Sequence, residues 1–195
     1  MKSHSAFKVY NSVKGKMAGI SHISCAAGQS GVCKGCEMKN ICYAQRYQRL
    51  RPSVLKSYLK NGEDLTARVY DMSELPYVNS SICRFNAFGE LYNGKKGEIQ
   101  LSNYCKTCLK NPDTTFVLWT RNYQMIARYF DYCPKPENLK IIRSTPRVND
   151  PVLTIPPGYD GIFNVVTNEY AEKNGIAINC GMKDENGEKI GCARC

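Results

Sequence analysis

The sequence lacks several features that would assign a function class at once. It has no apolar run approaching the roughly 18 residues that a membrane span requires, so we expect no membrane partner. It has no Walker-type phosphate loop, no GxSxG turn, no HExxH motif and no dinucleotide-binding fingerprint. Residues 1–10 lack the apolar core of a secretory signal. We therefore expect a cytoplasmic protein whose cysteines stay reduced.

Histidine and tryptophan are scarce, with two residues and one, whereas cysteine is abundant, with 11 residues in 195. An odd number of cysteines fits a disulfide framework poorly. In a reducing compartment, closely spaced thiols indicate metal ligation instead. Because histidines are so few, we expect all-cysteine sites, which suit iron–sulfur clusters or zinc.

Positive charge is concentrated in the first third of the chain. Residues 1–60 contain 11 lysines and arginines against a single acid, Glu37, whereas residues 61–195 are balanced. One interpretation is that this segment binds an anionic partner such as nucleic acid. The other is that it neutralises metal-bound thiolates, which the formal net charge of +10 ignores. The cysteines of the same segment favour the second interpretation, and both stay open.

The hydrophobic pattern predicts alternating helices and short strands. We expect one or two helices in residues 52–72, with a break at Asn61–Gly62, and further helices at Ile99–Lys110 and Tyr123–Phe130. Strands are expected at Ser81–Phe88, Phe116–Thr120, Leu139–Ile142 and Gly161–Val166. This order predicts an α/β fold with a mainly parallel sheet, either open or closed as a partial or small (βα) barrel-like structure.

We interpret residues 1–195 as one domain. It comprises a basic, Cys-rich, metal-binding segment (1–50), a βα core (51–175) and a second Cys-rich, metal-binding segment at the C-terminus (176–195).

The first cysteine group is Cys25, Cys33, Cys36 and Cys42. Its central CxxC is a thiolate knuckle in which Gly35 allows the tight turn that points both sulfurs at one centre. Four cysteines within 18 residues, in a segment with little apolar periodicity, predict a complete metal-binding tetrad.

The second group is Cys180, Cys192 and Cys195, again with a CxxC. Only three thiols are local, so the fourth ligand comes from elsewhere or is missing. An incomplete set would leave a coordination position open to substrate.

The other cysteines are predicted to be structural. Cys105 and Cys108 also form a CxxC, but they lie at helical spacing among apolar residues, as expected for core thiols. Cys83 alternates with apolar residues on a predicted strand, and Cys133 precedes a proline in a turn. Cys83, Cys105 and Cys108 remain alternative sources of a fourth ligand.

The spacing of the ligands distinguishes the candidate metals. Zinc sites often pair two close knuckles, whereas here each group has one knuckle, with outlying cysteines separated from it by seven, five and eleven intervening residues. This longer and irregular spacing of the ligands favours one or two iron–sulfur clusters of the 4Fe–4S type, with zinc as the alternative.

Polar residues follow the predicted strands. In parallel α/β sheets, functional groups lie at the carboxyl ends of the strands, which meet at one edge. Candidate site residues are Arg84, Asn86, Glu90, Arg121 and Arg143. Several hydrogen-bonding groups, including arginines, predict a polar or anion-binding cleft there.

Taken in order, several short motifs resemble the bacteriophage proteins catalogued as gene product 88, whose role is not established. These motifs are Cys42-Tyr43-Ala44, Arg84 with Gly89-Glu90, Asn111-Pro112-Asp113 with Trp119-Thr120-Arg121, Arg143-Ser144 and the terminal Cys180…Cys192-x-x-Cys195. The resemblance covers residues 15–195. It implies a phage origin, the cytoplasm of an infected host cell, and metal-binding cysteines at both ends.

The Cys-Tyr-Ala ending is also similar to radical S-adenosylmethionine proteins, which implies a parallel α/β barrel with a cluster at the strand tops. This chain has CxxC, five residues and Cys where those enzymes have CxxxCxxC.

We therefore expect an iron–sulfur phage protein with a redox or small-molecule site at the strand ends, served by a substrate or an electron donor. The alternative is a non-enzymatic phage factor, stabilised by zinc or a cluster, that binds nucleic acid or a host protein through its basic first third.

Overall fold

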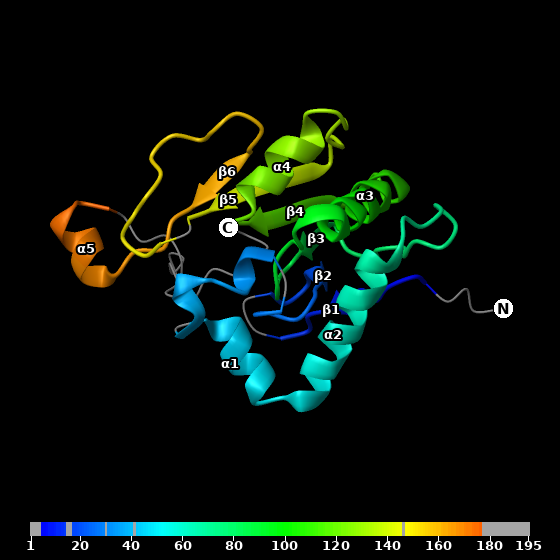
Figure 1. Ribbon diagram of the computed structural model, residues 1–195, viewed down its shortest axis with the longest axis horizontal. Coiled ribbons are helices and arrows are strands. Elements are labelled where there is room, and N and C mark those ends of the chain that lie inside the picture. The colour runs from blue at the N-terminus through cyan, green and yellow to red at the C-terminus, as the bar shows by residue number, and fades with distance from the viewer. Residues whose placement is uncertain (1–4, 15–16, 30, 41, 146, 177–195) are drawn as a thin grey trace.

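The computed structural model describes residues 5–14, 17–29, 31–40, 42–145 and 147–176, which form a six-stranded sheet with helices (Figure 1). The strands cross the sheet in chain order: β1 (Tyr10–Asn11), β2 (Ser21–Ile23), β3 (Ile82–Phe85), β4 (Thr115–Thr120), β5 (Leu139–Ser144) and β6 (Gly161–Phe163). The short edge strand β1 pairs antiparallel with β2, and the other four pairings are parallel. The predicted α/β class with a mainly parallel sheet is confirmed.

The helices within these ranges are α1 (Tyr43–Arg49), α2 (Pro52–Ala67), α3 (Gly94–Lys110), α4 (Tyr123–Phe130) and α5 (Asn168–Lys173). Each of α1 to α3 contacts the next helix along the chain, so α1 to α4 form a row beside the sheet (Figure 1). Among the described residues, none of the helices is both long enough and apolar enough to cross a bilayer.

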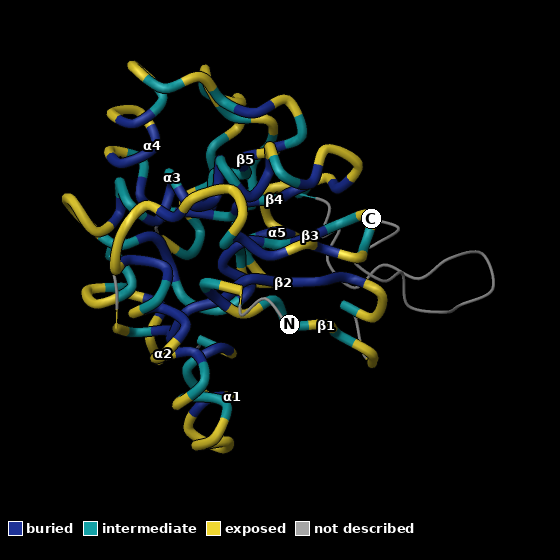
Figure 2. The backbone as a smooth tube through the Cα atoms, turned by 90° about the vertical axis from the view of Figure 1, so that its right-hand side faces the viewer, coloured by how far each residue is buried: buried dark blue, intermediate teal, exposed yellow. Residues whose placement is uncertain are grey.

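The core lies between the sheet and this row of helices. Side chains that alternate along the strands are fully buried there, among them Phe85, Leu118 and Ile141. The ring of Phe85 stacks on that of Tyr104 in α3, with the centroids 4.0 Å apart. Figure 2 shows the same pattern as dark, buried strand segments inside a lighter outer surface. Burial of these apolar side chains is the main force holding α3 on the sheet.

The predicted break at Asn61–Gly62 is wrong, because α2 runs through both residues. The Asn61 side chain donates to the carbonyl oxygens of Ser24 and Lys8 and accepts from the Lys8 amide. A Cβ on Gly62 would lie 2.7 Å from the Tyr92 hydroxyl. These two residues therefore serve as close contacts of a buried helix face, not as a turn.

The start of α3 was also predicted wrongly. The turn-like stretch Asn93–Gly97 opens the helix at Gly94, five residues before the predicted start. A Cβ on Gly97 would lie 2.1 Å from the Tyr92 carbonyl oxygen, so the glycine lets the helix approach the preceding loop. Observed β4 and α4 agree with the predictions to within one residue, whereas β2 and α1 were not predicted.

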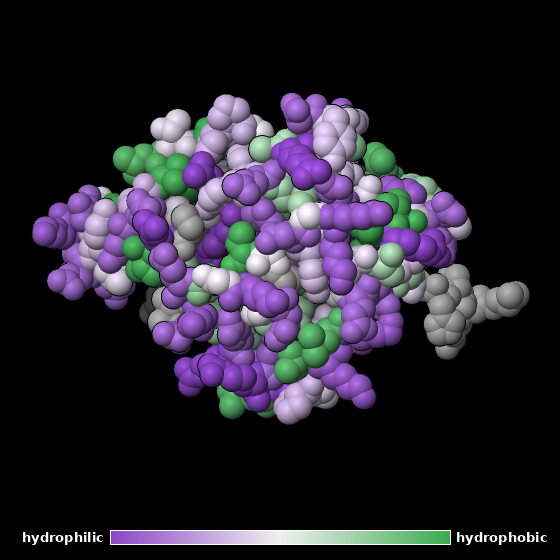
Figure 3. All heavy atoms as spheres, viewed as in Figure 1, coloured by the Kyte–Doolittle hydropathy of each residue, from purple (hydrophilic) through white to green (hydrophobic). Residues whose placement is uncertain are grey.

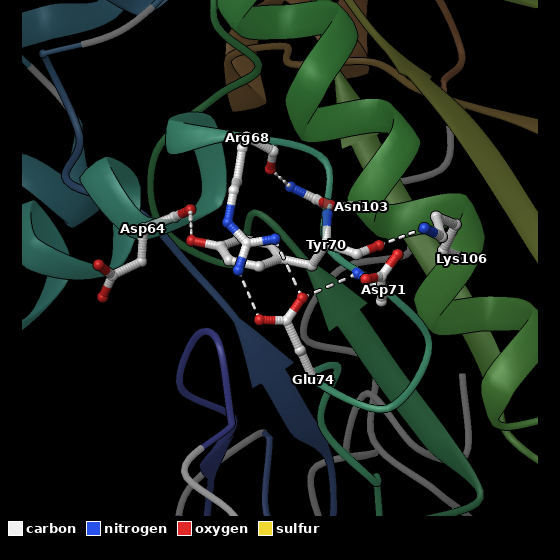
Figure 4. Close-up of polar contacts among 7 residues, drawn as sticks. All are labelled: Asp64, Arg68, Tyr70, Asp71, Glu74, Asn103 and Lys106. Carbon is white, nitrogen blue, oxygen red and sulfur yellow. Dashed lines mark hydrogen bonds and ion pairs between the residues drawn. The ribbon is translucent and has the colours of Figure 1, made fainter.

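The connection from α2 to β3 is fixed against α3 by polar contacts (Figure 4). The buried Asn103 amide accepts from the Tyr70 backbone N–H and donates to the carbonyl oxygens of Leu65 and Arg68. Nearer the surface, Glu74 forms a bidentate ion pair with Arg68. These contacts hold the 14 residues between α2 and β3 in one path and so help to set the position of β3.

Replacing Asn103 by Ala should lower the free energy of unfolding by about 1–3 kcal/mol, because buried backbone groups lose their partners. Urea denaturation measures this loss. Asn79→Ala, an exposed substitution in the same connection, should change stability by less than about 0.5 kcal/mol. Equal effects of the two substitutions would contradict the proposed role of Asn103.

Candidate functional site

The carboxyl ends of β3 and β4 are joined by the buried side chain of Glu90. One carboxylate oxygen accepts from the Thr120 hydroxyl at 2.6 Å and the Leu91 amide at 2.8 Å, and the other accepts from the Arg121 amide at 2.9 Å. Burial raises the pKa of Glu90, while these bonds and the Arg121 charge oppose that rise. Glu90 thus links the loop after β3 to the end of β4.

Arg121 extends this link in two directions. Its Nε donates to the Thr145 carbonyl oxygen beyond β5 at 2.8 Å, and its Nη2 lies 3.2 Å from the Met38 sulfur. Met38 belongs to the Cys-rich loop, which we define as the described residues between β2 and α1, namely 24–29, 31–40 and 42. One guanidinium therefore contacts both the β5 exit and the Cys-rich loop.

The Cys-rich loop lies against the same edge of the sheet at further points. Gly31 fits so closely that a Cβ there would overlap the Leu91 carbonyl oxygen. Glu37 pairs with Arg147 beyond β5 at 3.5 Å. The loop is therefore packed across the exits of β3, β4 and β5.

Three thiols of this loop are half-buried: Cys33, Cys36 and Cys42. The Cys33 sulfur accepts from the Gly28 backbone N–H at 3.0 Å. Burial raises the pKa of Cys33, and the charges of Glu90, Cys42 and Cys36 raise it further. The fold thus brings Cys33 within electrostatic range of both other thiols and of Glu90.

Cys25 differs from these three thiols because it is fully buried. Its sulfur lies 3.4 Å from the Glu90 carbonyl oxygen and packs against Gly89. The structure therefore places Cys25 in the interior, next to Gly89 and Glu90.

Within the described part of the chain, no three histidine, cysteine or acidic side chains are close enough to hold a metal ion. The second predicted group, Cys180, Cys192 and Cys195, lies outside the described residues, as does nearly all of the predicted C-terminal segment. The ligand sets remain predictions.

The remaining described cysteines are core or core-adjacent residues. Cys83, Cys105 and Cys108 are buried in the hydrophobic core, and Cys133 packs against it. Burial raises the pKa of Cys83 and of Cys105 to about 12, which favours neutral thiols. The predicted structural placement of these thiols is confirmed.

Two predicted site residues, Arg84 and Asn86, contact aromatic side chains. Arg84 projects from the opposite side of β3, where its guanidinium stacks over Trp119 at 4.1 Å. Asn86 has a positive φ of 52° and turns toward α3, where it accepts from the Tyr104 hydroxyl at 2.8 Å. The left-handed backbone at Asn86 ends β3 and separates the directions of these two side chains.

Arg143 lies at the end of β5, with its guanidinium 4.4 Å from the ring centre of Tyr123. Burial raises the pKa of Tyr159 to about 12, against an opposing effect from the Arg143 charge. Tyr123 and Tyr159 lie close enough to Glu90 to feel its charge. The position of Arg143 at a predicted strand end identified it as a candidate site residue. No feature of the sequence identified Met38 or these two tyrosines.

A cavity of about 540 Å³ opens beside Arg121. It is lined by Val32 of the Cys-rich loop, by the starts of α3 and α4, and by Arg128. The first turn of α3 carries Lys95 and Lys96 and no acidic residue. This volume falls in the range of small-molecule sites, and Arg121 lines the cavity, whereas Arg128 is paired with Glu98 at 3.0 Å.

Comparisons of this chain with protein-family models, curated proteins and solved structures found no match. The site is therefore interpreted from its own geometry.

Gly89→Ala should destabilise the protein by about 2–5 kcal/mol, from positive-φ strain and overlap with Cys25. Its φ is 84°, and a Cβ would lie 2.4 Å from the Cys25 sulfur and 2.6 Å from the Cys25 carbonyl oxygen.

Gly19 is a matched control, because its φ is 79° but no atom lies within 4 Å of an added Cβ. Gly19→Ala should cost only about 1–2 kcal/mol. Thermal and urea unfolding compare the two variants, and similar losses would show that the Gly89–Cys25 contact is not tight.

Proposed function

We propose that this chain is an iron–sulfur protein with a redox or small-molecule site at the carboxyl ends of its parallel strands. The observation that carries the proposal is the packing of the Cys-rich loop across that edge, through the contact between Arg121 and Met38. Half-buried thiols, a buried carboxylate and an arginine thereby lie along one edge of the sheet, which supports the proposal.

The donor set suits a cluster. Thiolates are the usual ligands of iron–sulfur centres, and N–H donors to sulfur tune their potentials, as Gly28 donates to Cys33. The buried NH₂ groups of Gln48 and Asn86 have no acceptor within the described residues, and their oxygens contact Ala27 and Cys25. Such donors are available to sulfur ligands placed beside this segment. Cys33, Cys36 and Cys42 would hold the cluster, with Cys25 as the fourth predicted ligand.

A bound cluster supplies one-electron redox chemistry. The residues of the chain would bind and orient the substrate. Arg121 and Arg143 offer guanidinium groups for an anionic substrate, and the neighbouring cavity has room for it. Glu90 holds the Arg121 backbone and so fixes one wall of that cavity.

The chain order of the parallel strands, with the helices in a row, supports a partial barrel as the finer description of the fold. The phage-protein family, the cytoplasmic setting and the second centre at Cys180, Cys192 and Cys195 belong to the same proposal.

Protein purified without oxygen should contain iron and acid-labile sulfide and show visible absorption that reductant bleaches. Replacing Cys33, Cys36 or Cys42 singly by Ser should remove most of the iron and sulfide of this centre, because each change removes a thiolate. A variant with Cys180, Cys192 and Cys195 all changed to Ser reports the N-terminal centre alone and is the background for these measurements.

Two further variants sharpen the result. Cys133→Ser, outside the loop, should retain the iron and serves as the control. Cys25→Ser tests whether the buried thiol is a ligand. If this variant retains its iron and its absorption is unchanged, Cys25 is not a ligand and the cluster is held by three thiolates. Zinc without sulfide in the unaltered protein would contradict the proposal and favour the non-enzymatic alternative.

A further inference from the structure

We infer that the exposed face of α1 binds single-stranded nucleic acid. This face, called the α1 surface below, consists of Tyr43, Tyr47 and Leu50 with the arginines Arg46, Arg49 and Arg51. It is argued from exposed rings and charge and does not depend on the iron–sulfur proposal.

The α1 surface exposes apolar and aromatic side chains that a folded protein usually buries. Tyr43 is 61% exposed, Tyr47 is 36% exposed and Leu50 is 69% exposed. These positions are four and three residues apart, so they lie on one side of the helix. Phe88 contacts both tyrosine rings, edge-on to Tyr43 at a centroid distance of 5.8 Å and tilted against Tyr47 at 5.3 Å. These contacts hold the two rings on an exposed helix face.

The charge around these rings has one sign. All of the Lys and Arg residues between positions 38 and 62 are exposed, and this stretch contains no acidic residue. Glu37, just before it, is paired with Arg147. The Arg51 guanidinium stacks over one face of the Tyr47 ring, 4.1 Å from its centre, so Tyr43 is the ring with the more accessible surface. Figure 3 shows hydrophilic side chains gathered with a few hydrophobic ones at the lower end of the molecule, where Figure 1 places α1.

A surface of exposed aromatic rings interleaved with cations is better suited to bind single-stranded than double-stranded nucleic acid. Unpaired bases stack on tyrosine rings while arginines contact the phosphates, and both terms are independent of base sequence. A duplex would expose no base faces to Tyr43 and Tyr47. With seven residues, α1 is also short for reading a major groove. The chemistry therefore favours single-stranded RNA or DNA as the partner.

Binding is measured by fluorescence anisotropy with a labelled 20-nucleotide single strand and a duplex of the same sequence. The single strand should bind more tightly, with an affinity that falls as salt rises. The combined variant Arg46→Ala/Arg49→Ala/Arg51→Ala should flatten the log–log salt slope by about 2, since each phosphate contact contributes about 0.7. Tyr43→Leu/Tyr47→Leu keeps apolar packing but removes the ring faces, and should weaken binding by about 5- to 150-fold for each base that loses its stacking.

Lys14→Ala/Lys140→Ala/Lys173→Ala is the matched control, because it removes three exposed charges elsewhere. It should leave the salt slope nearly unchanged, and melting temperatures of all variants confirm that they fold. Equal losses in the two charge variants would overturn the inference, since net charge alone would explain them. Tighter binding to the duplex than to the single strand would also overturn the inference. So would a protein that binds vesicles of anionic phospholipid at low salt but does not bind the single strand. Iron content measured on the same variants keeps this test separate from the cluster proposal.

Discussion

The buried carboxylate of Glu90 is the interaction on which the candidate site depends. A carboxylate in a dry interior is costly unless several donors surround it. Here two backbone amides and the Thr120 hydroxyl supply those donors. Because the donors come from the loop after β3 and the end of β4, satisfying one charge also fixes the relative position of two strand exits. Arg121, whose amide is one of the donors, then reaches the β5 exit and the Cys-rich loop.

The glycines near Glu90 let the Cys-rich loop approach this edge closely. Gly89 contacts Cys25, and Gly31 contacts the backbone of Leu91, each at a distance that excludes a Cβ. Both glycines have positive φ, so they also allow backbone conformations that other residues resist. The Cys-rich loop thus lies over the strand ends because its backbone packs closely against the backbone of the segment that follows β3. A site built this way has thiols, a carboxylate and guanidinium groups at one edge, with a small cavity beside them.

The α1 surface stands next to this edge, since α1 begins directly after Cys42. Its tyrosines rest on Phe88, in the same loop that carries Gly89 and Glu90. If both proposals hold, a nucleic-acid strand on α1 would lie near the cluster-binding loop. Metal binding and nucleic-acid binding would then share a rigid support, although they use different side chains.

The sequence by itself determined the elements whose signal is local. The apolar run of β4 and the amphipathic pattern of α4 need no distant partner, and both were predicted closely. The helical spacing of Cys105 and Cys108 likewise separated core thiols from candidate ligands. Only the tertiary structure decided features set by contacts between distant segments. Asn61 and Gly62 continue α2 because Ser24 and Cys25, directly after β2, and Tyr92, in the loop before α3, pack against them. Arg84 and Asn86, two residues apart, point to different sides because the positive φ at Asn86 reverses the strand alternation. Cys25 was grouped with Cys33, Cys36 and Cys42 by sequence distance, but it is buried against Gly89 whereas the other three are half-buried, and sequence spacing carries no information about depth.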